Sequence, residues 1–275
     1  MVDPRSVGIR WTIGDVSDAG FEALRLSLWG AWKLFGPRAA YAVCVNAITP
    51  AEARARTGAV PPGVEWRAST RDQLPAPLDV CIDAGMAEGA GWKLAPPRLF
   101  PDRWELSLDN DVILWELPAA IRSWLESADP DATLMAEDVR ACFGRFAERC
   151  GDQPRNAGIR GFPPGFDLAA ALRAVLDEAA GPISSEVDEQ GLQTAALARG
   201  GTMHVVTLDD VTICSPFPPH LSGPGRCGVH FVGLNARRLP WSYEGRPATH
   251  HLREHWRRLR GLVYQRVGLP LTEAA

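Results

Sequence analysis

The amino-acid sequence predicts an α/β protein in which helices flank a mostly parallel sheet. Apolar strand-like runs alternate with amphipathic helical segments through the first half of the chain, the order typical of layered α/β domains. Residues 39–48, AAYAVCVNAI, are almost continuously apolar, as in a strand buried on both faces of a parallel sheet. With 275 residues, 46% of them hydrophobic, the chain can bury a large core, and we expect a single domain spanning 1–275.

The first half contains the clearest periodicity. Residues 18–36 have the apolar spacing of an amphipathic helix, with Asp18 expected as the N-cap and Gly36 at the end. A second helix with Pro50 near its start is expected over residues 49–58. The other elements expected in this half are strands at 7–14, 39–48, 63–69, 104–111 and 132–136 and a helix at 117–128.

The second half is less regular and more variable in pattern. Residues 155–166, RNAGIRGFPPGF, have the glycine and proline content of a loop. Residues 202–214 are expected to form a hairpin with Asp209–Asp210 at its tip, and residues 225–235 a last strand. The remaining elements expected are helices at 167–181, with Asp167 as N-cap, at 184–201 and at 249–268.

Composition and charge exclude several classes of function. The formal net charge is −4 and no extended basic face is predicted, so nucleic acid is not expected as a partner. No apolar run approaches the roughly 18 residues of a membrane span, and residues 1–11 lack the apolar segment of a secretory signal. The six cysteines form no CxxC pair, which favours free thiols in a reducing compartment. We therefore expect a cytoplasmic protein.

A short acidic turn interrupts an apolar run at Asp109–Asn110–Asp111. The turn follows a predicted strand, and ligands of parallel sheets collect at the carboxyl ends of strands. Two carboxylates separated by one residue can bind a single Mg²⁺ or Mn²⁺, which commonly bridges to the phosphates of a substrate. A turn stabilised by its own Asp and Asn side chains would have the same sequence. The pattern alone leaves both interpretations open.

Five segments, including the one that contains the acidic turn, resemble a known family. They are GWKLAPPRL at 91–99, SLDND at 107–111, RNAGIRG at 155–161, VDEQGLQTAAL at 187–197 and HFVGLNARRLPW at 230–241. In this order they resemble the motifs of GT-A glycosyltransferases, in particular the family-8-like enzymes that use nucleotide-sugar donors. The resemblance spans roughly residues 7–241. It implies the GT-A fold, a Rossmann-like arrangement.

The resemblance implies a metal site and a phosphate site. Asp109, Asp111 and His230 match the residues that bind a divalent cation, Mn²⁺ or Mg²⁺, between the two donor phosphates. Gly233 would let the backbone approach the phosphates. Lys93 lies in the segment that carries a phosphate-binding lysine. The family often has Lys-Pro-Trp after H-F-x-G, whereas this chain has an insertion, and either Arg237 or Arg238 would replace that lysine on the pyrophosphate.

The resemblance also implies a sugar site. Asn156 and Gly158 match the loop that contacts the donor sugar. Asp188, Glu189 and Gln190 match the catalytic segment beneath the anomeric carbon. Carboxylates there would stabilise the transition state of a retaining enzyme, or one would be the general base of an inverting enzyme. From the sequence alone, an acidic first helical turn favoured by the helix dipole would have the same pattern.

The implied reaction is metal-dependent hexosyl transfer from a nucleoside-diphosphate sugar, with UDP-sugar and retention favoured, to an unknown hydroxyl acceptor. The acceptor would be a glycan, a lipid-linked sugar or a small molecule. Residues 1–136 would form the nucleotide-binding half, and residues 137–275 the half that binds acceptor and sugar and carries the C-terminal helix.

Two other classes of function remain open. A nucleotidyltransferase would use the same paired acids but usually has a glycine-rich, basic loop after the first strand, whereas residues 11–21, WTIGDVSDAGF, are acidic. A catalytically silent protein that binds a nucleotide-sugar would keep the motifs without turnover.

The C-terminal helix carries two further patterns. His251, Glu254 and His255 match the H-x-x-E-H signature of inverted zinc proteases, but only Glu273 follows as a further ligand, so zinc hydrolysis is not expected. The arginines of this helix predict a solvated face or a peripheral contact with anionic lipid or a phosphorylated acceptor. They are Arg253, Arg257, Arg258, Arg260 and Arg266. His204 lies in an apolar run and is expected to be an ordinary sheet histidine.

Overall fold

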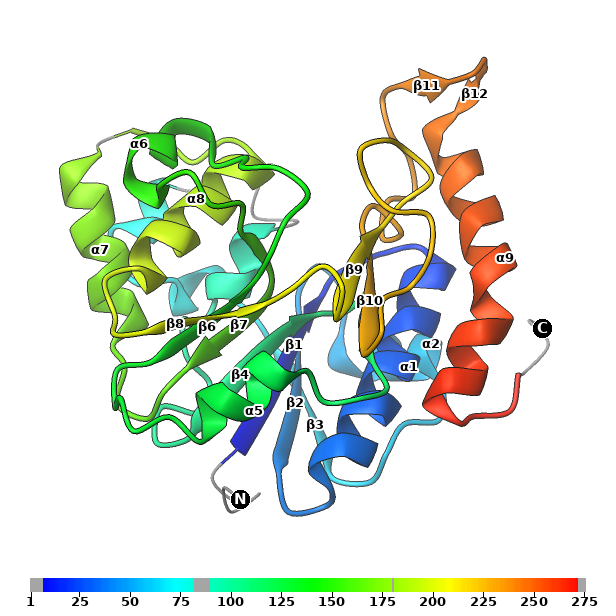
Figure 1. Cartoon of the computed structure of the whole chain (residues 1–275), viewed down its shortest axis with the longest axis horizontal. Helices are drawn as coiled ribbons and strands as arrows, with labels where there is room; N and C mark the ends of the chain where they lie inside the picture. Colours follow the sequence, from blue (N-terminus) through cyan, green and yellow to red (C-terminus); the bar gives the residue numbers. More distant parts are fainter. Residues whose placement is uncertain (1–6, 82–89, 180, 272–275) are drawn as a thin grey trace.

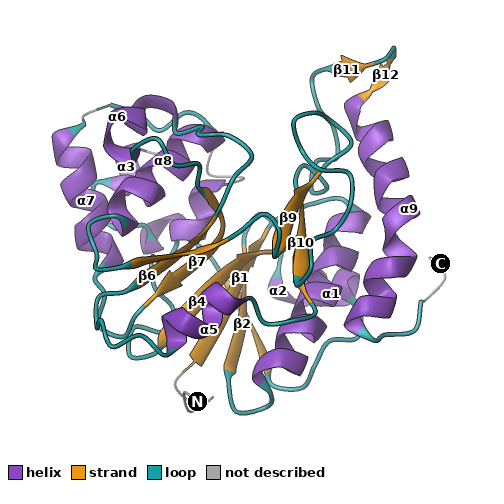
Figure 2. Cartoon of the chain, viewed as in Figure 1, coloured by secondary structure: helices purple, strands orange, loops and turns teal. Residues whose placement is uncertain are grey.

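The computed structural model describes residues 7–81, 90–179 and 181–271. A seven-stranded sheet crosses the middle of the molecule and has helices on both faces (Figures 1 and 2). Its strand order is β3-β2-β1-β4-β7-β6-β8. All neighbouring strands are parallel except that β7 runs antiparallel to both β4 and β6. The predicted α/β class with a mostly parallel sheet is confirmed.

The strands of the large sheet are β1 (Val7–Ile13), β2 (Ala40–Val45), β3 (Val64–Ala68), β4 (Trp104–Asp109), β6 (Thr133–Ala136), β7 (Asn156–Phe162) and β8 (Met203–Val206). A second sheet has the order β5-β10-β9, with β5 (Val112–Leu114), β9 (Val211–Cys214) and β10 (Gly228–Phe231). Strands β11 (Ser242–Tyr243) and β12 (Arg246–Pro247) form a small hairpin.

Eight segments of the described part of the chain are labelled α, some of them single turns, with 3₁₀ turns between them. The α-helices are α1 (Asp18–Phe35), α2 (Pro50–Thr57), α3 (Leu78–Cys81), α5 (Ala119–Leu125), α6 (Ala147–Cys150), α7 (Leu168–Glu178), α8 (Glu186–Leu197) and α9 (Ala248–Val267). The 3₁₀ turns are η2 (Arg71–Gln73), η3 (Ala90–Leu94) and η4 (Gly144–Phe146). Gly36, with φ of 73°, ends α1 as predicted, but its N-cap is Ser17 rather than Asp18, because the Ser17 hydroxyl accepts from the Gly20 N–H.

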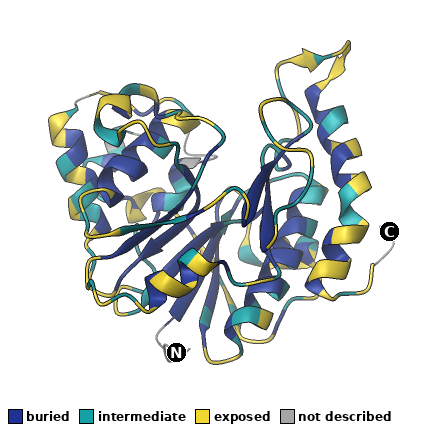
Figure 3. Cartoon of the chain, in the orientation of Figure 1, coloured by how far each residue is buried: buried dark blue, intermediate teal, exposed yellow. Residues whose placement is uncertain are grey.

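Three apolar clusters hold these layers together. The buried residues run along the strands of the central sheet (Figure 3). The first packs α1 and α5 on one face of the large sheet, around Trp11, Leu28 and Trp124. The second packs α7 and α8 against β6 and β7. The third lies between the other side of α1, the three-stranded sheet and α9, where Phe231 and Trp256 stack edge to face. Helix α1 is therefore buried on two sides and fixes the small sheet beside the large one.

Residues 156–162 form a buried central strand, β7, so the loop predicted for residues 155–166 is wrong there. The glycines of this segment give room to neighbouring side chains rather than forming turns. A Cβ on Gly161 would lie 2.7 Å from Trp124 and from Leu134 Cβ. The polar side chain of Arg160 is buried because it has partners in the fold.

The hairpin predicted at residues 202–214 is also wrong. Strand β8 pairs with β6 in the large sheet, and β9 pairs with β10 in the three-stranded sheet. Residues Asp209 and Asp210 lie in the crossover between the two sheets. Both β8 and β9 have the alternating apolar and polar pattern of a strand, but that pattern does not specify which strand each one pairs with.

All six cysteines are free thiols, as predicted. His204 lies on β8, as expected of a sheet histidine. None of the described helices combines the length and the apolar character needed to cross a bilayer. Residues 1–6 of the N-terminal segment and Glu273 lie outside the described residues.

Candidate functional site

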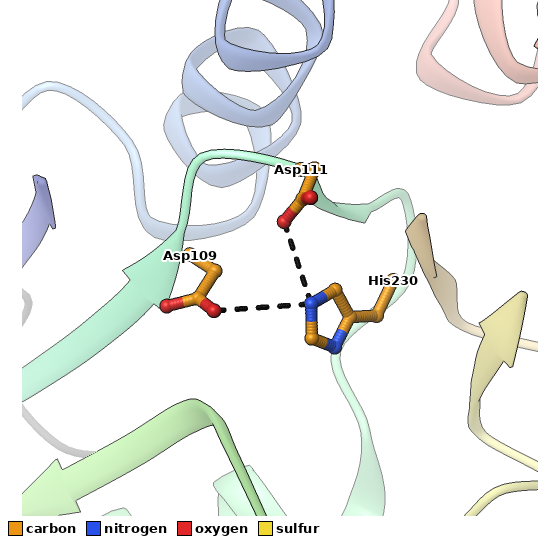
Figure 4. Close-up of side chains that lie close together, drawn as sticks. All are labelled: Asp109, Asp111 and His230. Carbon is orange, nitrogen blue, oxygen red and sulfur yellow. Dashed lines mark ion pairs between the residues drawn. The ribbon is translucent and has the colours of Figure 1, made fainter. Parts of the chain in front are cut away.

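Three side chains converge where β4 ends and the small sheet begins. Asp109 is the last residue of β4, Asp111 precedes β5, and His230 lies on β10 opposite Val112. His230 Nε2 is 3.4 Å from Asp111 Oδ1 and 3.8 Å from Asp109 Oδ2 (Figure 4). One ligand atom from each of the three residues lies within 4.8 Å of the others. The acidic turn thus connects two sheets and lies beside a histidine more than a hundred residues away.

Hydrogen bonds between the side-chain amides of Asn110 and Asn235 fix the shape of the acidic turn. Asn110 Nδ2 donates to Asn235 Oδ1 at 2.7 Å and to the Gly20 carbonyl at 3.2 Å. In return, Asn235 Nδ2 donates to Asn110 Oδ1 at 3.0 Å and to Asp111 Oδ2 at 3.1 Å. Asn110 is buried, so these hydrogen bonds satisfy an amide that would otherwise be costly to bury. One oxygen of Asp111 is held, and the other is left facing His230.

The charges of the cluster support one another despite burial. Burial alone would raise the pKa of Asp109, but Lys93 and His230 outweigh it and hold that pKa below its ordinary value. Burial alone would lower the pKa of His230, but the carboxylates of Asp111 and Asp109 raise it. The two carboxylates of the site therefore stabilise a positive charge placed between them.

The donor set fits a divalent cation. Two carboxylates and one imidazole are ligands that Mn²⁺ accepts readily, whereas imidazole suits Mg²⁺ less well. Asp111 Oδ1 is buried and has no well-formed hydrogen bond within the described residues. Because buried polar atoms normally have a partner, this oxygen is available to bind a cation. Among the described residues, this is the one group of three or more His, Cys, Asp and Glu side chains that converges in this way.

A cavity of about 490 Å³ opens beside the cluster. One end is lined at the carboxyl ends of β1 and β2 by Thr12, Gly14 and Asn46. The opposite wall is formed by the start of β7 and the first turns of α8. The predicted site residues that line this cavity are Lys93, Asp109, Asp111, Asn156, Gly158, Glu189, Gln190, His230 and Gly233. The fold brings these nine residues, from motifs far apart in the sequence, to one cavity.

Asn156 and Gln190 are joined below the cavity wall through Asp138. Asn156 Nδ2 donates to Asp138 Oδ2 at 3.0 Å, and Gln190 Nε2 donates to the Cys142 carbonyl at 3.0 Å and approaches the same Asp138 oxygen at 3.4 Å. Gln190 Oε1 accepts from the Ala157 N–H at 3.3 Å. These contacts fix the amide of Gln190 against β7. The sequence pattern gave no role to Asp138.

Glu189 is a buried carboxylate at the cavity wall, with an exposed fraction of 2%. Burial raises its pKa to about 7, against the opposing charges of Lys93 and Arg160. Gln193 donates to Glu189 Oε1, and Arg160 donates both to Gln193 and to Ser107 Oγ, the latter at 2.7 Å. We define Arg160, Gln193 and Glu189 as the buried relay. Arg160 and Gln193 are not predicted from the sequence, because nothing local marks them as partners.

Asp188 does not line the cavity. Its carboxylate accepts from the Arg145 N–H at 3.0 Å and from the Ser184 N–H at 3.3 Å, so it fixes the entry to α8. Gly233 lines the cavity with φ of 84°, a conformation that favours glycine. The two predicted phosphate arginines are not with the acidic cluster. Arg237 forms an ion pair with Asp15 and donates to the Val16 carbonyl at 3.1 Å, and Arg238 is exposed outside the cavity lining.

The H-x-x-E-H pattern does not form a metal site in the described structure. His251 Nε2 lies 2.8 Å from the Tyr243 carbonyl, whereas His255 Nε2 lies 3.1 Å from Cys214 Sγ. Burial lowers the pKa of His255 to about 4 and raises that of Cys214 to about 12, so both are neutral at pH 7. His255 and Cys214 thus form a hydrogen bond inside the fold.

The fold resembles that of glycosyltransferases of known structure. No family model and no curated protein matches the sequence. Among solved structures, the galactosyltransferase LgtC in complex with donor and acceptor sugar analogues matches with a TM-score of 0.51 and 12% sequence identity, over 97% of each chain. An active-site mutant of LgtC matches with a TM-score of 0.50 and 12% identity, over 92% of this chain and 99% of that one. The likeness shows the fold, and the GT-A arrangement expected from the motifs is confirmed.

Proposed function

We propose that the protein is a metal-dependent glycosyltransferase that uses a nucleoside-diphosphate sugar, with UDP-sugar favoured. The observation that carries the proposal is the convergence of Asp109, Asp111 and His230 at one wall of a cavity whose opposite wall holds Asn156 and Glu189. A diphosphate needs a cation, and a transferred sugar needs polar groups on the other side. The fold shared with a galactosyltransferase agrees with this arrangement.

Each end of the cavity has a proposed occupant. The nucleoside lies at the carboxyl ends of β1 and β2, which agrees with a nucleotide-binding first half, residues 1–136. The sugar lies against Asn156, Gly158 and α8 in the second half, residues 137–275. The acceptor hydroxyl enters beside the sugar.

Asp109, Asp111 and His230 would hold the cation. When bound, it supplies Lewis-acid stabilisation of the charge that builds on the departing nucleoside diphosphate. Lys93 adds a fixed positive charge next to Asp109 Oδ2. Lys93 lines the cavity 2.7 Å from Asp109 Oδ2, so its ammonium is placed to contact a phosphate that the cation holds. Gly233 would present its backbone to the phosphates, because it lines the cavity in a conformation, with φ of 84°, that favours glycine.

Among Asp188, Glu189 and Gln190, we assign Glu189 as the charged group that faces the transferred sugar. It lines the cavity, whereas Asp188 accepts hydrogen bonds from the backbone outside it. In the reaction, the bond from the anomeric carbon to the diphosphate oxygen breaks and a bond to the acceptor oxygen forms on the same face. The acceptor proton leaves with the diphosphate. Ionised Glu189 stabilises the positive charge on the sugar ring during this exchange.

Thermal unfolding with a panel of nucleoside diphosphates and their sugars, with and without Mn²⁺, tests the donor site. A ligand that binds only the folded protein raises the Tm. We expect one nucleotide to raise the Tm of the wild type only with Mn²⁺, and Asp111→Asn to lose that shift. Asp131→Asn, which removes one exposed carboxylate elsewhere, is the control and should keep it. If no nucleotide shifts the wild type with any metal, the acidic turn is structural only.

Product analysis separates the three classes of function. Incubation with the stabilising nucleotide-sugar and mixed acceptors should release nucleoside diphosphate and form a glycoside. Consumption of a sugar phosphate and a nucleoside triphosphate with release of pyrophosphate would instead identify a nucleotidyltransferase. Donor binding without any turnover would identify a silent nucleotide-sugar-binding protein.

A further inference from the structure

A second concave site lies outside the cavity described above, between α1, α2 and α9. Helix α9 runs beside α1 at the right of the molecule (Figure 1), and the groove between them has a volume of about 1110 Å³. We call it the arginine groove. It is lined by six arginines and two acids, a net of four positive charges, in a chain whose formal net charge is −4. The arginines are Arg25, Arg56, Arg237, Arg253, Arg257 and Arg260.

The arginines come from three separate helices and one loop, so the tertiary fold assembles them. Arg253, Arg257 and Arg260 recur at helical spacing on the side of α9 that faces α1. Arg25 and Arg56 line the facing side from α1 and α2. A solvated helix face alone would not need matching charges on two other helices, and like charges gathered in a groove repel one another unless an anion joins them.

The acids in and around the groove are already engaged. Glu22 accepts from Trp256 Nε1 at 3.0 Å, Tyr264 Oη at 2.6 Å and Arg260 Nε at 2.7 Å. Asp15 and Asp18 pair with Arg56 at 2.6 and 3.2 Å. Glu22 thus holds its partners in position and neutralises only part of their charge.

Two arginines of the groove have no acidic partner among the described residues, although Arg253 donates to the Arg237 carbonyl at 3.5 Å. In the described ranges, Arg253 and Arg257 form no ion pair within 4.0 Å, and both are exposed to the groove one turn apart on α9. Guanidinium groups bind phosphate oxygens through two parallel hydrogen bonds, and two of them together match a dianionic group. The groove has room for more than a single phosphate, so it can hold a phosphate that is part of a larger molecule.

We propose that the arginine groove binds a phosphate-bearing ligand distinct from the sugar donor, with Arg253 and Arg257 as its principal contacts. The groove meets the donor cavity at Ala236, which lines both, but shares none of the residues of the acidic cluster. The phosphate belongs either to a soluble phosphorylated molecule or to a phospholipid headgroup. This proposal does not depend on the transfer reaction.

Binding of two phosphate probes tests the groove in buffer with EDTA, which removes the cation needed at the acidic cluster. The first probe is tripolyphosphate, followed by calorimetry, and the second is mixed phosphatidylcholine–phosphatidylglycerol vesicles, followed by sedimentation. The double variant Arg253→Gln/Arg257→Gln is compared with Arg122→Gln/Arg266→Gln, which changes the charge equally at exposed sites outside the groove.

We expect the groove variant to lose about tenfold or more in affinity for the bound probe, because two charge-assisted contacts are removed, and the control variant to keep wild-type affinity. Binding of tripolyphosphate would identify a soluble phosphorylated ligand, and binding of vesicles alone would identify a lipid headgroup. Absence of binding to the wild type by both probes would overturn the proposal. So would an equal loss in the two double variants, which would reveal only the effect of net charge.

Discussion

Lys93 and His230 approach the same oxygen of Asp109. Lys93 Nζ lies 2.7 Å from Asp109 Oδ2, and His230 Nε2 lies 3.8 Å from it. Burial opposes the charge on Lys93, but Asp109 and Glu189 outweigh it and raise the Lys93 pKa. The Lys93 ammonium is therefore a fixed positive charge that pairs with Asp109, one of the proposed metal ligands. It stabilises the carboxylate without a cation and competes with a cation for that oxygen.

Replacement of Lys93 should have opposite effects on two ligands. In Lys93→Gln, the affinity for Mn²⁺ alone should rise by roughly tenfold, because a like charge next to the cation is removed. The affinity for a nucleoside diphosphate in saturating Mn²⁺ should fall, because a charged phosphate contact is lost. Titration with Mn²⁺ by electron paramagnetic resonance measures the first effect and calorimetry the second. Arg122→Gln serves as the distant charge control. Weaker binding of both ligands would make Lys93 only a support for Asp109.

Two glycines on β7 provide a matched pair of variants. A Cβ on Gly158 would collide with the imidazole of His230, and a Cβ on Gly161 would collide with Trp124 in the core. Both Gly158→Ala and Gly161→Ala should lower stability by about 1–3 kcal/mol through overpacking. Only Gly158→Ala should also abolish the Mn²⁺-dependent rise in Tm, because His230 must move. If Gly161→Ala loses that rise to the same extent, the effect comes from general loosening of β7.

The sequence predicted most elements whose cause is local. The apolar run of β2 and the periodicity and stop of α1 depend on neighbouring residues, and both appear as expected. The ordered motifs also indicated residues that the fold brings to one cavity, such as Asp111, Asn156 and His230. These predictions used spacing along the chain or resemblance to a family, and neither requires the tertiary contacts to be known.

The errors have tertiary causes. The glycines of β7 predict a loop because they look like turn residues, but Gly158 and Gly161 instead make room for His230 and Trp124. Arg160 is buried with Gln193 and Ser107, which lie 33 and 53 residues away in sequence. Arg237, expected on the pyrophosphate, is paired with Asp15. No local pattern specifies such partners.

The contacts of the buried relay predict that Gln193 affects turnover by positioning Glu189. In Gln193→Met, a side chain of similar size removes the contacts to Glu189 and Arg160. Stability should fall by about 1–3 kcal/mol because two buried polar groups lose a partner. If Glu189 faces the sugar, kcat should fall while KM for the donor stays near the wild-type value. Gln265→Met, an exposed change on α9, is the control. An unchanged kcat per folded molecule would show that Glu189 needs no positioning.

The pKa of Glu189 predicts a pH dependence of stability in the metal-free protein. Burial raises this pKa from 4.5 to about 7, so the folded protein holds a proton that the unfolded chain has released between these values. Stability from this group is therefore greatest below pH 4.5 and is lost as the pH rises through about 7. Over that window the difference amounts to roughly 3 kcal/mol.

Glu189→Gln removes this titration and keeps a side chain of the same shape. Most other groups are the same in both proteins, so the difference between their unfolding free energies reports Glu189 together with the neighbours whose pKa it shifts, such as Lys93. Urea unfolding in EDTA at pH 5 and pH 8 should show that the variant gains on the wild type as the pH rises. Since Lys93 and Arg160 attract the ionised form, a smaller gain would mean that they offset more of the cost of burial. A wild type that gains on the variant with rising pH would place the pKa of Glu189 below its ordinary value, and the carboxylate would be stably ionised at the cavity wall.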